Sequence, residues 1–300
     1  MSTDGPTADR TSQPGDAVVL AVDLGTGGPK IALISLGGEI IGSAHGRVQP
    51  RVAADGTASQ SPDEWWRAVG DGAAELTRAH PDAAARVVAV AVTGQWGSTV
   101  PVDASGNAVG DCLLWMDTRG AALAAKQVGG RISVEGLGVA KVLPWIRRSG
   151  GAPSTEGNDP LGHRLYVETH QPDVYRRTHA FVEPLDYLVG RFTGRVAASR
   201  PSMTLSWLTD NRGSVDDAYD PTLVELAGTD PAKLPPLVPI GTSVGTVLPE
   251  VAEAMGLPDG VPVLTAIPDL HAATLGSGAI GNYEGHVSIS TSAWIGTHAP

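Results

Sequence analysis

A glycine-rich stretch near the N-terminus has an acid before its glycines and a lysine after them: residues 21–30 read AVDLGTGGPK. It is neither a Walker loop, which ends in Gly-Lys-Ser/Thr, nor a dinucleotide loop, which needs a third glycine where Lys30 stands. The glycines instead predict a tight β-turn that lets backbone N–H groups approach a ligand closely. An acid such as Asp23 fits beside phosphates only with a cation between them, which points to Mg²⁺. A glycine-rich hairpin without a ligand is the alternative.

Asp269 closes the segment Ala-Ile-Pro-Asp at residues 266–269, directly after a run that predicts a buried strand. Open α/β sheets bind ligands at the carboxyl ends of their strands, where a carboxylate can accept the proton of an attacking hydroxyl. The structural alternative is an N-cap for the helix that follows. The run Ser290-Thr291-Ser292 also has two interpretations, as a plain β-turn or as a second phosphate-binding turn.

Two further stretches combine tryptophan with polar side chains that suit a polyol. Gln95 and Trp96 follow a predicted buried strand, and the stretch from Trp115 through Asp117 to Arg119 follows another apolar run. Sugars present apolar C–H faces together with hydroxyl donors and acceptors, which indole, amide, carboxylate and guanidinium groups can match. These stretches therefore predict a sugar site. The alternative for each tryptophan taken singly is a place in the core.

The elements that must position these residues follow from the apolar patterns. Three short apolar segments separated by glycine-containing turns predict a meander of strands at 18–23, 31–36 and 39–45. A capping box, Ser61-Pro-Asp-Glu64, and apolar residues at helical spacing predict a helix that runs toward His80. The β-branched run at 86–92 predicts a strand buried on both faces, and a fifth strand is predicted at 98–102.

The second half of the sequence predicts mainly helices, at 172–178, 184–194, 248–255 and 272–278. One buried strand is predicted at 262–267, and a strand, a turn and a second strand at 285–300, where the chain stops. Antiparallel strands followed by helix, strand and further helices predict a mixed α/β layer instead of a simple doubly wound one. Because chains seldom end where a new sheet opens, we expect the C-terminus to be a truncation.

Composition restricts the classes of function. The 300 residues are 42% hydrophobic, which is enough for a large core. The net charge is -11 and no Lys/Arg cluster is present, so neither nucleic acid nor a membrane is an expected partner. The single cysteine, Cys112, excludes a disulfide or a cysteine metal site and predicts a buried thiol in a reducing cytoplasm. Residues 1–16 have no signal-peptide features and are expected to form a disordered tail.

Taken in order, these motifs resemble those of the FGGY carbohydrate kinases, most closely the xylulokinase-like members. The resemblance covers nearly the whole chain after residue 16. The matching stretches are Asp23-Leu-Gly-Thr26 with Lys30, Gln60-Ser-Pro-Asp-Glu-Trp-Trp66, Thr93-Gly-Gln95, Leu114-Trp-Met-Asp-Thr-Arg119, residues 185–194, Asp269, and Ser290-Thr-Ser292. The sequence departs from the family at Trp96-Gly97, where xylulokinases usually carry Met-His, and at Ile267-Pro268 and Ser290, where glycines are usual.

The resemblance implies a ribonuclease-H-like α/β fold of the actin/hexokinase type, with a mixed sheet and a truncated second domain. It implies transfer of the γ-phosphoryl group of ATP to a ketopentose such as xylulose or a related sugar or polyol, with ATP and Mg²⁺ as cofactors. It also implies a cytoplasmic enzyme, with a homodimer as one possible assembly. The implied roles are deprotonation of the hydroxyl by Asp269, anchoring of Mg²⁺ by Asp23, sugar binding by Gln95, Trp96, Asp117 and Arg119, and phosphate binding by Gly25, Thr26, Gly27, Lys30, Thr291 and Ser292.

The implied domains are residues 17–281, which bind sugar and phosphate, and residues 282–300, which begin the ATP-binding domain. Two other functions remain open. A chain without the ATP-binding half could bind sugar and phosphorylate nothing. An actin-type or chaperone-type ATPase would share the first loop but would not need the stretches at Gln95 and Asp117.

Overall fold

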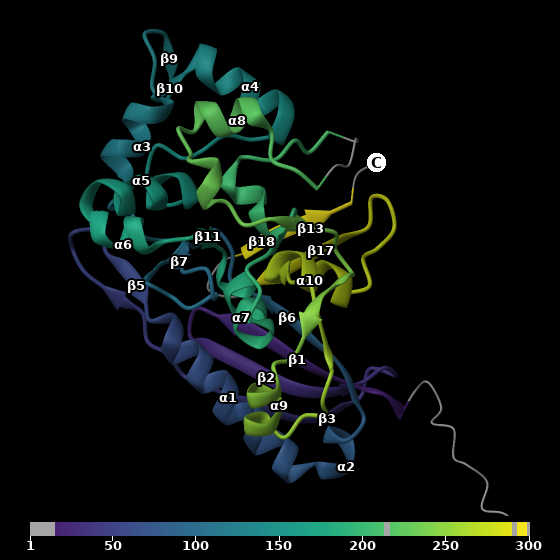
Figure 1. Cartoon of the computed structure of the whole chain (residues 1–300). Coiled ribbons are helices and arrows are strands. Elements are labelled where there is room, and N and C mark those ends of the chain that lie inside the picture. The colour runs from purple at the N-terminus through teal and green to yellow at the C-terminus, as the bar shows by residue number, and fades with distance from the viewer. Residues whose placement is uncertain (1–15, 213–216, 290–292, 299–300) are drawn as a thin grey trace, which may run out of the picture.

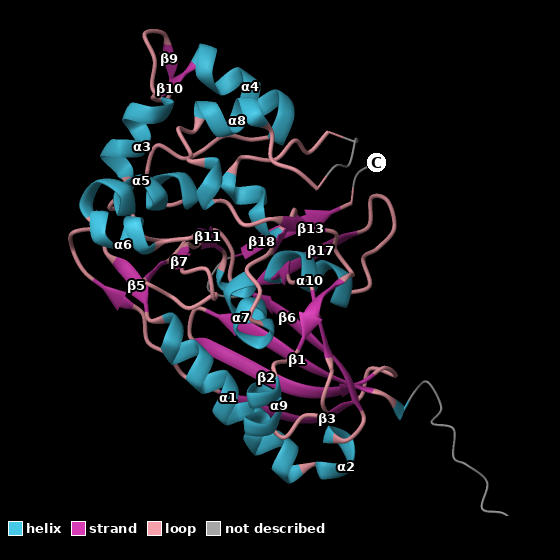
Figure 2. Cartoon of the chain, viewed as in Figure 1, coloured by secondary structure: helices cyan, strands magenta, loops and turns pink. Residues whose placement is uncertain are grey.

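The computed structural model describes residues 16–212, 217–289 and 293–298. Its centre is a seven-stranded mixed sheet (Figure 1, Figure 2). The strand order is β14 (Ser243–Thr246), β15 (Pro262–Leu264), β6 (Val87–Gly94), β1 (Val18–Gly25), β2 (Gly28–Ser35) and β3 (Ile40–His45), with β16 (Ile267–Pro268) also paired to β6. The predicted meander and the predicted mixed sheet are both confirmed.

The central strand β1 is antiparallel to β2 and parallel to β6. Every second residue of β1 is fully buried because successive side chains of a strand point to opposite faces: Val18, Leu20, Val22 and Leu24. These side chains belong to the same core as Trp65 and Val69 of the helix α1 (Pro62–Ala79). The apolar alternation in β1 thus fixes which face of the sheet α1 covers.

Two sequence predictions about local structure are wrong. Helix α1 begins at Pro62 as expected, but the side chain of Ser61 makes no capping hydrogen bond, so the capping box does not form. The predicted fifth strand is shorter, β7 (Val100–Val102), and it pairs with β11 (Ala180–Val182) outside the central sheet. Its register is set by the segment that leads into α7 (Pro184–Thr193), a pairing distant in sequence that local patterns cannot reveal.

Of the other helices, several lie beyond the sheet (Figure 1), and their side chains form a second apolar cluster that includes Trp145, Leu161 and Leu223. Their bounds are α2 (Pro81–Ala84), α3 (Ala121–Val128), α4 (Val139–Ser149), α5 (Pro160–His170), α6 (Pro172–Arg177), α8 (Pro221–Leu226), α9 (Pro249–Met255) and α10 (Asp269–Gly276), with short 3₁₀ helices at Ser202–Ser206 and Pro231–Lys233. None of the described helices combines the length and the hydropathy that crossing a bilayer requires.

Short strands complete the fold at its periphery. Their bounds are β4 (Arg51–Val52), β5 (Ala58–Gln60), β8 (Cys112–Leu113), β9 (Ser133–Val134), β10 (Leu137–Gly138), β12 (Ala198–Ser199), β13 (Leu237–Val238), β17 (Gly285–Ile289) and β18 (Ala293–Thr297). Cys112 is fully buried, as the sequence predicts. The predicted C-terminal pair of strands is confirmed as β17 and β18, which pair with each other.

Candidate active site

The carboxyl ends of three neighbouring strands meet at one edge of the sheet. Thr93 of β6 is in register with Asp23 of β1 on one side and with Ile267 of β16 on the other. The Thr93 hydroxyl donates a hydrogen bond to the carbonyl oxygen of Ile267 over 2.8 Å. Asp269 follows β16 directly, so the fold brings it beside the glycine-rich stretch that follows Asp23. This is the edge at which open α/β sheets bind ligands.

The glycine-rich stretch forms a two-residue hairpin turn, with Gly25 paired to Gly28. Strands lie on both sides of the turn, as the sequence predicts, and no helix follows it. Gly28 has a φ of 121°, and a Cβ atom there would lie 2.4 Å from the carbonyl oxygen of Gly46. Only glycine fits this position. A Cβ on Gly27 would meet no atom of the described residues within 4 Å, so the described part of the chain leaves that side of the turn open.

The turn presents donors and charges together. Among the described residues, no acceptor is bonded to the backbone N–H of Thr26 or of Gly27. The Lys30 ammonium donates to Asp23 Oδ2 over 2.9 Å, and the side chains are 60% and 37% exposed. Both ends of this ion pair therefore remain accessible to a ligand, which the turn can approach with N–H groups and with one charge of each sign.

A pocket of about 430 Å³ opens at this edge of the sheet. It brings together seven of the residues that the sequence predicts: Gly25, Thr26, Gly27, Lys30, Gln95, Trp96 and Asp269. Three further residues line it: Trp115, Leu270 and Trp294. A volume of this size lies in the range that holds small metabolites.

A hydrogen-bond network fixes one wall of this pocket. The Thr26 hydroxyl donates to Gln95 Oε1 over 3.2 Å, and the backbone N–H of Gln95 donates to the carbonyl oxygen of Leu24 over 2.7 Å. Behind them, Gln60 Nε2 donates to the carbonyl oxygens of Thr26 and Val48 over 2.8 and 3.0 Å. The turn and Gln95 are therefore held in place before any ligand binds.

Three tryptophans, Trp96, Trp115 and Trp294, supply indole rings to the pocket, and hydrogen bonds hold the first two. Trp96 Nε1 donates to the carbonyl oxygen of Ser202 over 2.7 Å, and Trp115 Nε1 donates to the Thr26 hydroxyl over 3.3 Å. Trp115 is 39% exposed, unusual for so large an apolar side chain. The sequence marked the stretch from Trp115 to Arg119 as a sugar site but placed the binding groups on Asp117 and Arg119.

Asp117 and Arg119 do not line the pocket. Asp117 is fully buried, and its carboxylate accepts hydrogen bonds from Arg119 Nε and Nη2 and from the backbone N–H of Ala58, the last over 2.9 Å. Arg119 also lies over the ring of Tyr166, 4.5 Å from its centroid. The pair braces the loop that carries Trp115 and leaves no carboxylate oxygen facing the pocket.

Asp269 is the first residue of α10, and Pro268 is the N-cap. Its Oδ1 accepts a hydrogen bond from the backbone N–H of Leu270 over 2.7 Å. Burial raises the pKa of the Asp269 carboxyl and nearby Asp23 adds to the rise, while the Leu270 N–H and Lys30 oppose it. A carboxylate with a raised pKa is a stronger proton acceptor than an ordinary one.

The predicted second phosphate turn, with Thr291 and Ser292, lies outside the described residues. The strands on either side of it are described, and Trp294 of β18 lines the pocket. Trp294 and Leu270 are pocket residues that the sequence reasoning missed. Each lies within two residues of a predicted site residue, which is the only signal the sequence offers for them.

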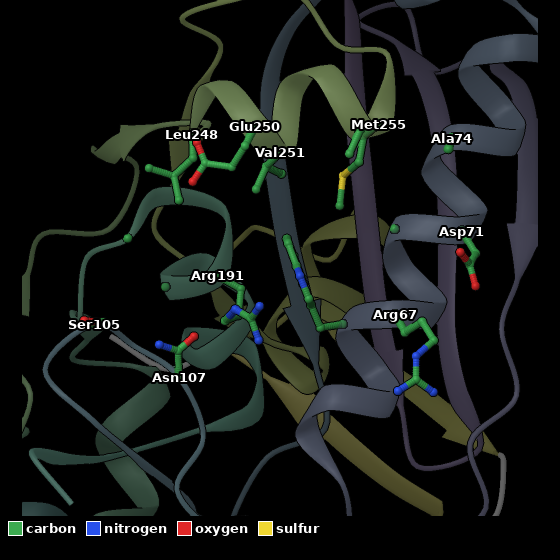
Figure 3. Close-up of a pocket in the computed structure, with 15 residues that line it drawn as sticks. Arg67, Asp71, Ala74, Ser105, Asn107, Arg191, Leu248, Glu250, Val251 and Met255 are labelled. Atoms are coloured by element: carbon green, nitrogen blue, oxygen red, sulfur yellow. The ribbon is translucent and has the colours of Figure 1, made fainter.

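A second, larger cleft of about 520 Å³ lies between α1, α7 and α9 (Figure 3). Its walls include Trp66 and Arg67 of α1, Arg191 of α7, and Val251 and Met255 of α9. It shares no lining residue with the pocket at the strand ends. We place the chemistry at the strand ends despite the smaller volume, because a carboxylate that follows a strand, an open glycine turn and three indole rings converge there.

The described residues contain no group of three or more His, Cys, Asp or Glu side chains that could hold a metal ion. A cation at the strand ends would therefore take few ligands from the protein. Mg²⁺ is commonly bound in this way, with one or two carboxylates and with substrate phosphates and waters completing its shell. The carboxylate of Asp23, partly exposed beside the turn, is compatible with such a site.

Comparisons with known proteins agree with this arrangement. Residues 18–137 and 153–276 match the FGGY family of carbohydrate kinases, N-terminal domain. The xylulose kinases of Streptomyces coelicolor and Streptomyces rubiginosus are 32% and 31% identical to this chain, each over 87% of it. The chain spans about half the length of these curated relatives, 50% in both cases.

Solved structures show the same fold. A xyloylose kinase from Brucella ovis superposes with a TM-score of 0.80 at 24% identity, over 93% of this chain and 54% of that one. A Plasmodium falciparum glycerol kinase with ADP gives a TM-score of 0.78 at 16% identity, with the same coverage. The predicted α/β fold of the actin/hexokinase type is confirmed. The chain belongs to the FGGY family of carbohydrate kinases, and what it contains is that family's N-terminal domain.

Proposed function

We propose that this chain supplies the sugar-binding and phosphate-binding part of a kinase that transfers the γ-phosphoryl group of ATP to a ketopentose such as xylulose, or to a related sugar or polyol. The observation that carries the proposal is that Asp269, the glycine turn and three indole rings line one pocket. The names of the relatives, which are xylulose kinases, support the choice of sugar.

The sugar would lie against Trp96 and Trp115, whose indole faces suit apolar C–H surfaces. Gln95 would offer its amide to the hydroxyl groups. Asp117 and Arg119 would act on the sugar through Trp115, because their ion pair is occupied in bracing the loop that carries it. This gives the stretch from Trp115 to Arg119 a role in the site without direct contact by its charged members.

Asp269 would accept the proton of the attacking sugar hydroxyl. The hydroxyl oxygen would form a bond to the γ-phosphorus as the bond from that phosphorus to the β–γ bridging oxygen breaks, so that ADP leaves with the electron pair. The raised pKa of the Asp269 carboxyl favours this proton transfer. The N–H groups at Gly25, Thr26 and Gly27, with Lys30, would hold phosphate oxygens while charge moves between them.

Asp23 would anchor Mg²⁺, directly or through water, with Lys30 moving from the carboxylate to the phosphates. When bound, the ion would neutralise phosphate charge. The roles of Thr291 and Ser292 as a second phosphate turn remain part of the proposal. Residues 17–281 would be the sugar- and phosphate-binding domain and 282–300 the start of the ATP-binding domain, which agrees with a family match ending at residue 276.

The test is an assay of the chain with ATP, Mg²⁺ and a panel of ketopentoses and polyols, scoring ADP release and sugar phosphate, with sugar binding measured separately by calorimetry. Asp269→Asn should abolish transfer and leave sugar affinity largely unchanged, because it removes the proton acceptor but keeps the side-chain shape. Asp259→Asn, at an exposed position outside the pocket, is the control.

Three outcomes contradict the proposal in different ways. Failure of the wild-type chain to bind any sugar or polyol of the panel removes the sugar site, whereas sugar binding without turnover fits a chain that supplies only this part of a kinase, or a sugar-binding protein that lacks catalysis. ATP hydrolysis that is independent of sugar supports an ATPase of the actin or chaperone type. Transfer by the Asp269→Asn variant near the wild-type rate assigns Asp269 to the start of α10 and removes it from the chemistry.

A further inference from the structure

A buried arginine on α5 makes no ion pair among the residues that the structure describes. Arg164, on α5, is 6% exposed, and among the described residues no carboxylate oxygen lies within 4.0 Å of its guanidinium group. Two of its buried nitrogens, Nε and Nη2, have no hydrogen-bond acceptor. Burial lowers the pKa of Arg164 to about 10, so the group still carries its charge at neutral pH. A buried cation of this kind is costly unless something compensates it.

Asp159, the acid with the strongest electrostatic effect on Arg164, already accepts hydrogen bonds from other groups. Asp159 is the N-cap of α5, and its carboxylate accepts hydrogen bonds from the backbone N–H groups of Ser154 and Gly162 over 2.7 and 3.1 Å. It also accepts one from Trp207 Nε1 over 3.2 Å. These donors occupy the carboxylate, and Nε and Nη2 of Arg164 find no acceptor in the described part of the chain.

Arg164 lines a small cavity that also reaches Glu183. The free volume of this cavity is about 10 Å³, which is enough for one small occupant. The cavity is lined by Ser98, Thr99, Pro160, Arg164, Phe181, Val182, Glu183, Met203, Ser206 and Leu234. Most of its wall is apolar, so the polar groups that face it have few partners other than an occupant.

Glu183 also lines the cavity, but it makes no ion pair with Arg164 among the described residues. Its Oε2 accepts a hydrogen bond from the backbone N–H of Ser98 over 3.0 Å, and its Oε1 has no partner among the described residues. Burial raises the pKa of the Glu183 carboxyl well above its ordinary value, and Asp186 adds to the rise. A neutral carboxyl group can donate a hydrogen bond to an anion but leaves the charge of Arg164 unbalanced.

We propose that this cavity binds a small monovalent anion, of the halide class, held by Nε and Nη2 of Arg164. An anion would supply both acceptors for the two free N–H groups and the negative charge that the cavity lacks. In its protonated form, which burial favours, the Glu183 carboxyl would turn its proton toward the same ion. The site shares no lining residue with the pocket at the strand ends, so its occupancy does not depend on the proposed kinase reaction.

The site lies behind one wall of the sugar pocket. Ser98, whose N–H is held by Glu183, accepts a hydrogen bond on its hydroxyl oxygen from the backbone N–H of Trp115 over 3.0 Å. An anion at Arg164 would thus complete the support beneath the loop that carries Trp115. Its expected effect is on the stability of the folded chain, by selective binding to the native state.

The test is thermal unfolding of the chain in potassium chloride or bromide against potassium methanesulfonate at equal ionic strength, since methanesulfonate is too large for the cavity. Halide should raise the unfolding midpoint by about 2–4 °C. Arg164→Gln should abolish this difference, while Arg131→Gln, at an exposed position, should keep it. Crystals grown in bromide should show an anomalous peak beside Arg164.

The rival is a water molecule that bridges Arg164 to an ionised Glu183. It predicts equal midpoints in halide and methanesulfonate and no bromide peak, and either result overturns the proposal. Glu183→Gln separates the two further, because an amide keeps a donor toward an anion but removes the charge of a bridged ion pair. A halide shift that survives in Glu183→Gln supports the anion site. A halide shift that survives in Arg164→Gln as well shows a general salt effect or an adventitious ion only, and overturns the assignment.

Discussion

Asp117 and Asp210 offer the same Asp-x-Arg ion pair in two environments. Asp117 pairs with Arg119 and Asp210 with Arg212, each through both carboxylate oxygens. The side chains of the first pair are 0% and 16% exposed, and those of the second are 26% and 61% exposed. Asp117→Asn and Asp210→Asn therefore remove the same charge at the same spacing, once in a buried and once in an exposed pair, and the buried carboxylate also accepts a hydrogen bond from Ala58.

The expected loss in the free energy of unfolding follows from the groups that each carboxylate binds. In Asp117→Asn the amide NH₂ group would face N–H donors from Arg119 or from Ala58, and the guanidinium would lose its counter-charge in a largely buried place. Breaking a buried pair in this way costs about 3 kcal/mol. The contact with Arg212 lowers the pKa of Asp210 to about 2, but solvent screens this exposed pair, so its loss should cost less than about 1 kcal/mol.

Urea unfolding followed by tryptophan fluorescence and circular dichroism measures both costs. With a urea dependence of about 3 kcal/mol per M, Asp117→Asn should lower the midpoint by about 1 M, and Asp210→Asn by less than about 0.3 M. The slope must stay constant for the comparison to hold. Equal midpoint shifts for the two variants would refute the argument that the Asp117–Arg119 pair derives its importance from burial.

Three further predictions concern the turn, a buried acid and the thiol. Gly28→Ala should lower the free energy of unfolding by about 2 kcal/mol or more in urea unfolding, because its Cβ would lie 2.4 Å from the Gly46 oxygen. Gly27→Ala should change this free energy little, because its Cβ would meet no atom of the described residues within 4 Å. Burial raises the pKa of Asp186 from 3.8 to about 8, so the folded state retains a proton that the unfolded chain releases, and stability should fall as pH rises from about 4 to about 8. Asp186→Asn should reduce that slope by up to about 1.4 kcal/mol per pH unit, and an unchanged slope in urea titrations would contradict this. Burial also raises the pKa of the Cys112 thiol, so a thiol reagent should modify it only after unfolding; rapid labelling of the native chain would be the opposite result.

Local patterns were sufficient for the elements that dominate the fold. The alternation in β1 and the helical spacing in α1 predict both elements, since each follows from the burial of one face. The length and the partner of the strand at residues 98–102 could not be predicted from the sequence. This strand, β7, pairs with β11, which is distant from it in sequence. The failure of the Ser61 cap has the same origin, since a cap depends on a side-chain rotamer that the sequence pattern does not specify.

The residues of the candidate site likewise include some that the sequence could predict and some that it could not. Residue types at strand ends predicted Asp269, Gln95, Trp96 and the glycine turn, because the ends of neighbouring strands must meet. Asp117 was assigned to the sugar by its residue type and by the family resemblance, and sequence cannot tell a carboxylate that faces a ligand from one that is paired with an arginine two residues away. Trp115 is the reverse case, an apolar residue whose partial exposure only the fold reveals.

The register that joins Asp23, Thr93 and Ile267 has a consequence for how the chain folds. The strands β1 to β6 come from the first third of the sequence, whereas β15 and β16 come from its last part, so the two carboxylates of the site meet only after a long loop closes. Until then β6 is an open edge whose sequence, Val-Val-Ala-Val-Ala-Val, carries no charge and no proline. Such an edge pairs readily with other chains. We therefore expect the protein to need a chaperone most during its synthesis, before residues 262–268 have left the ribosome.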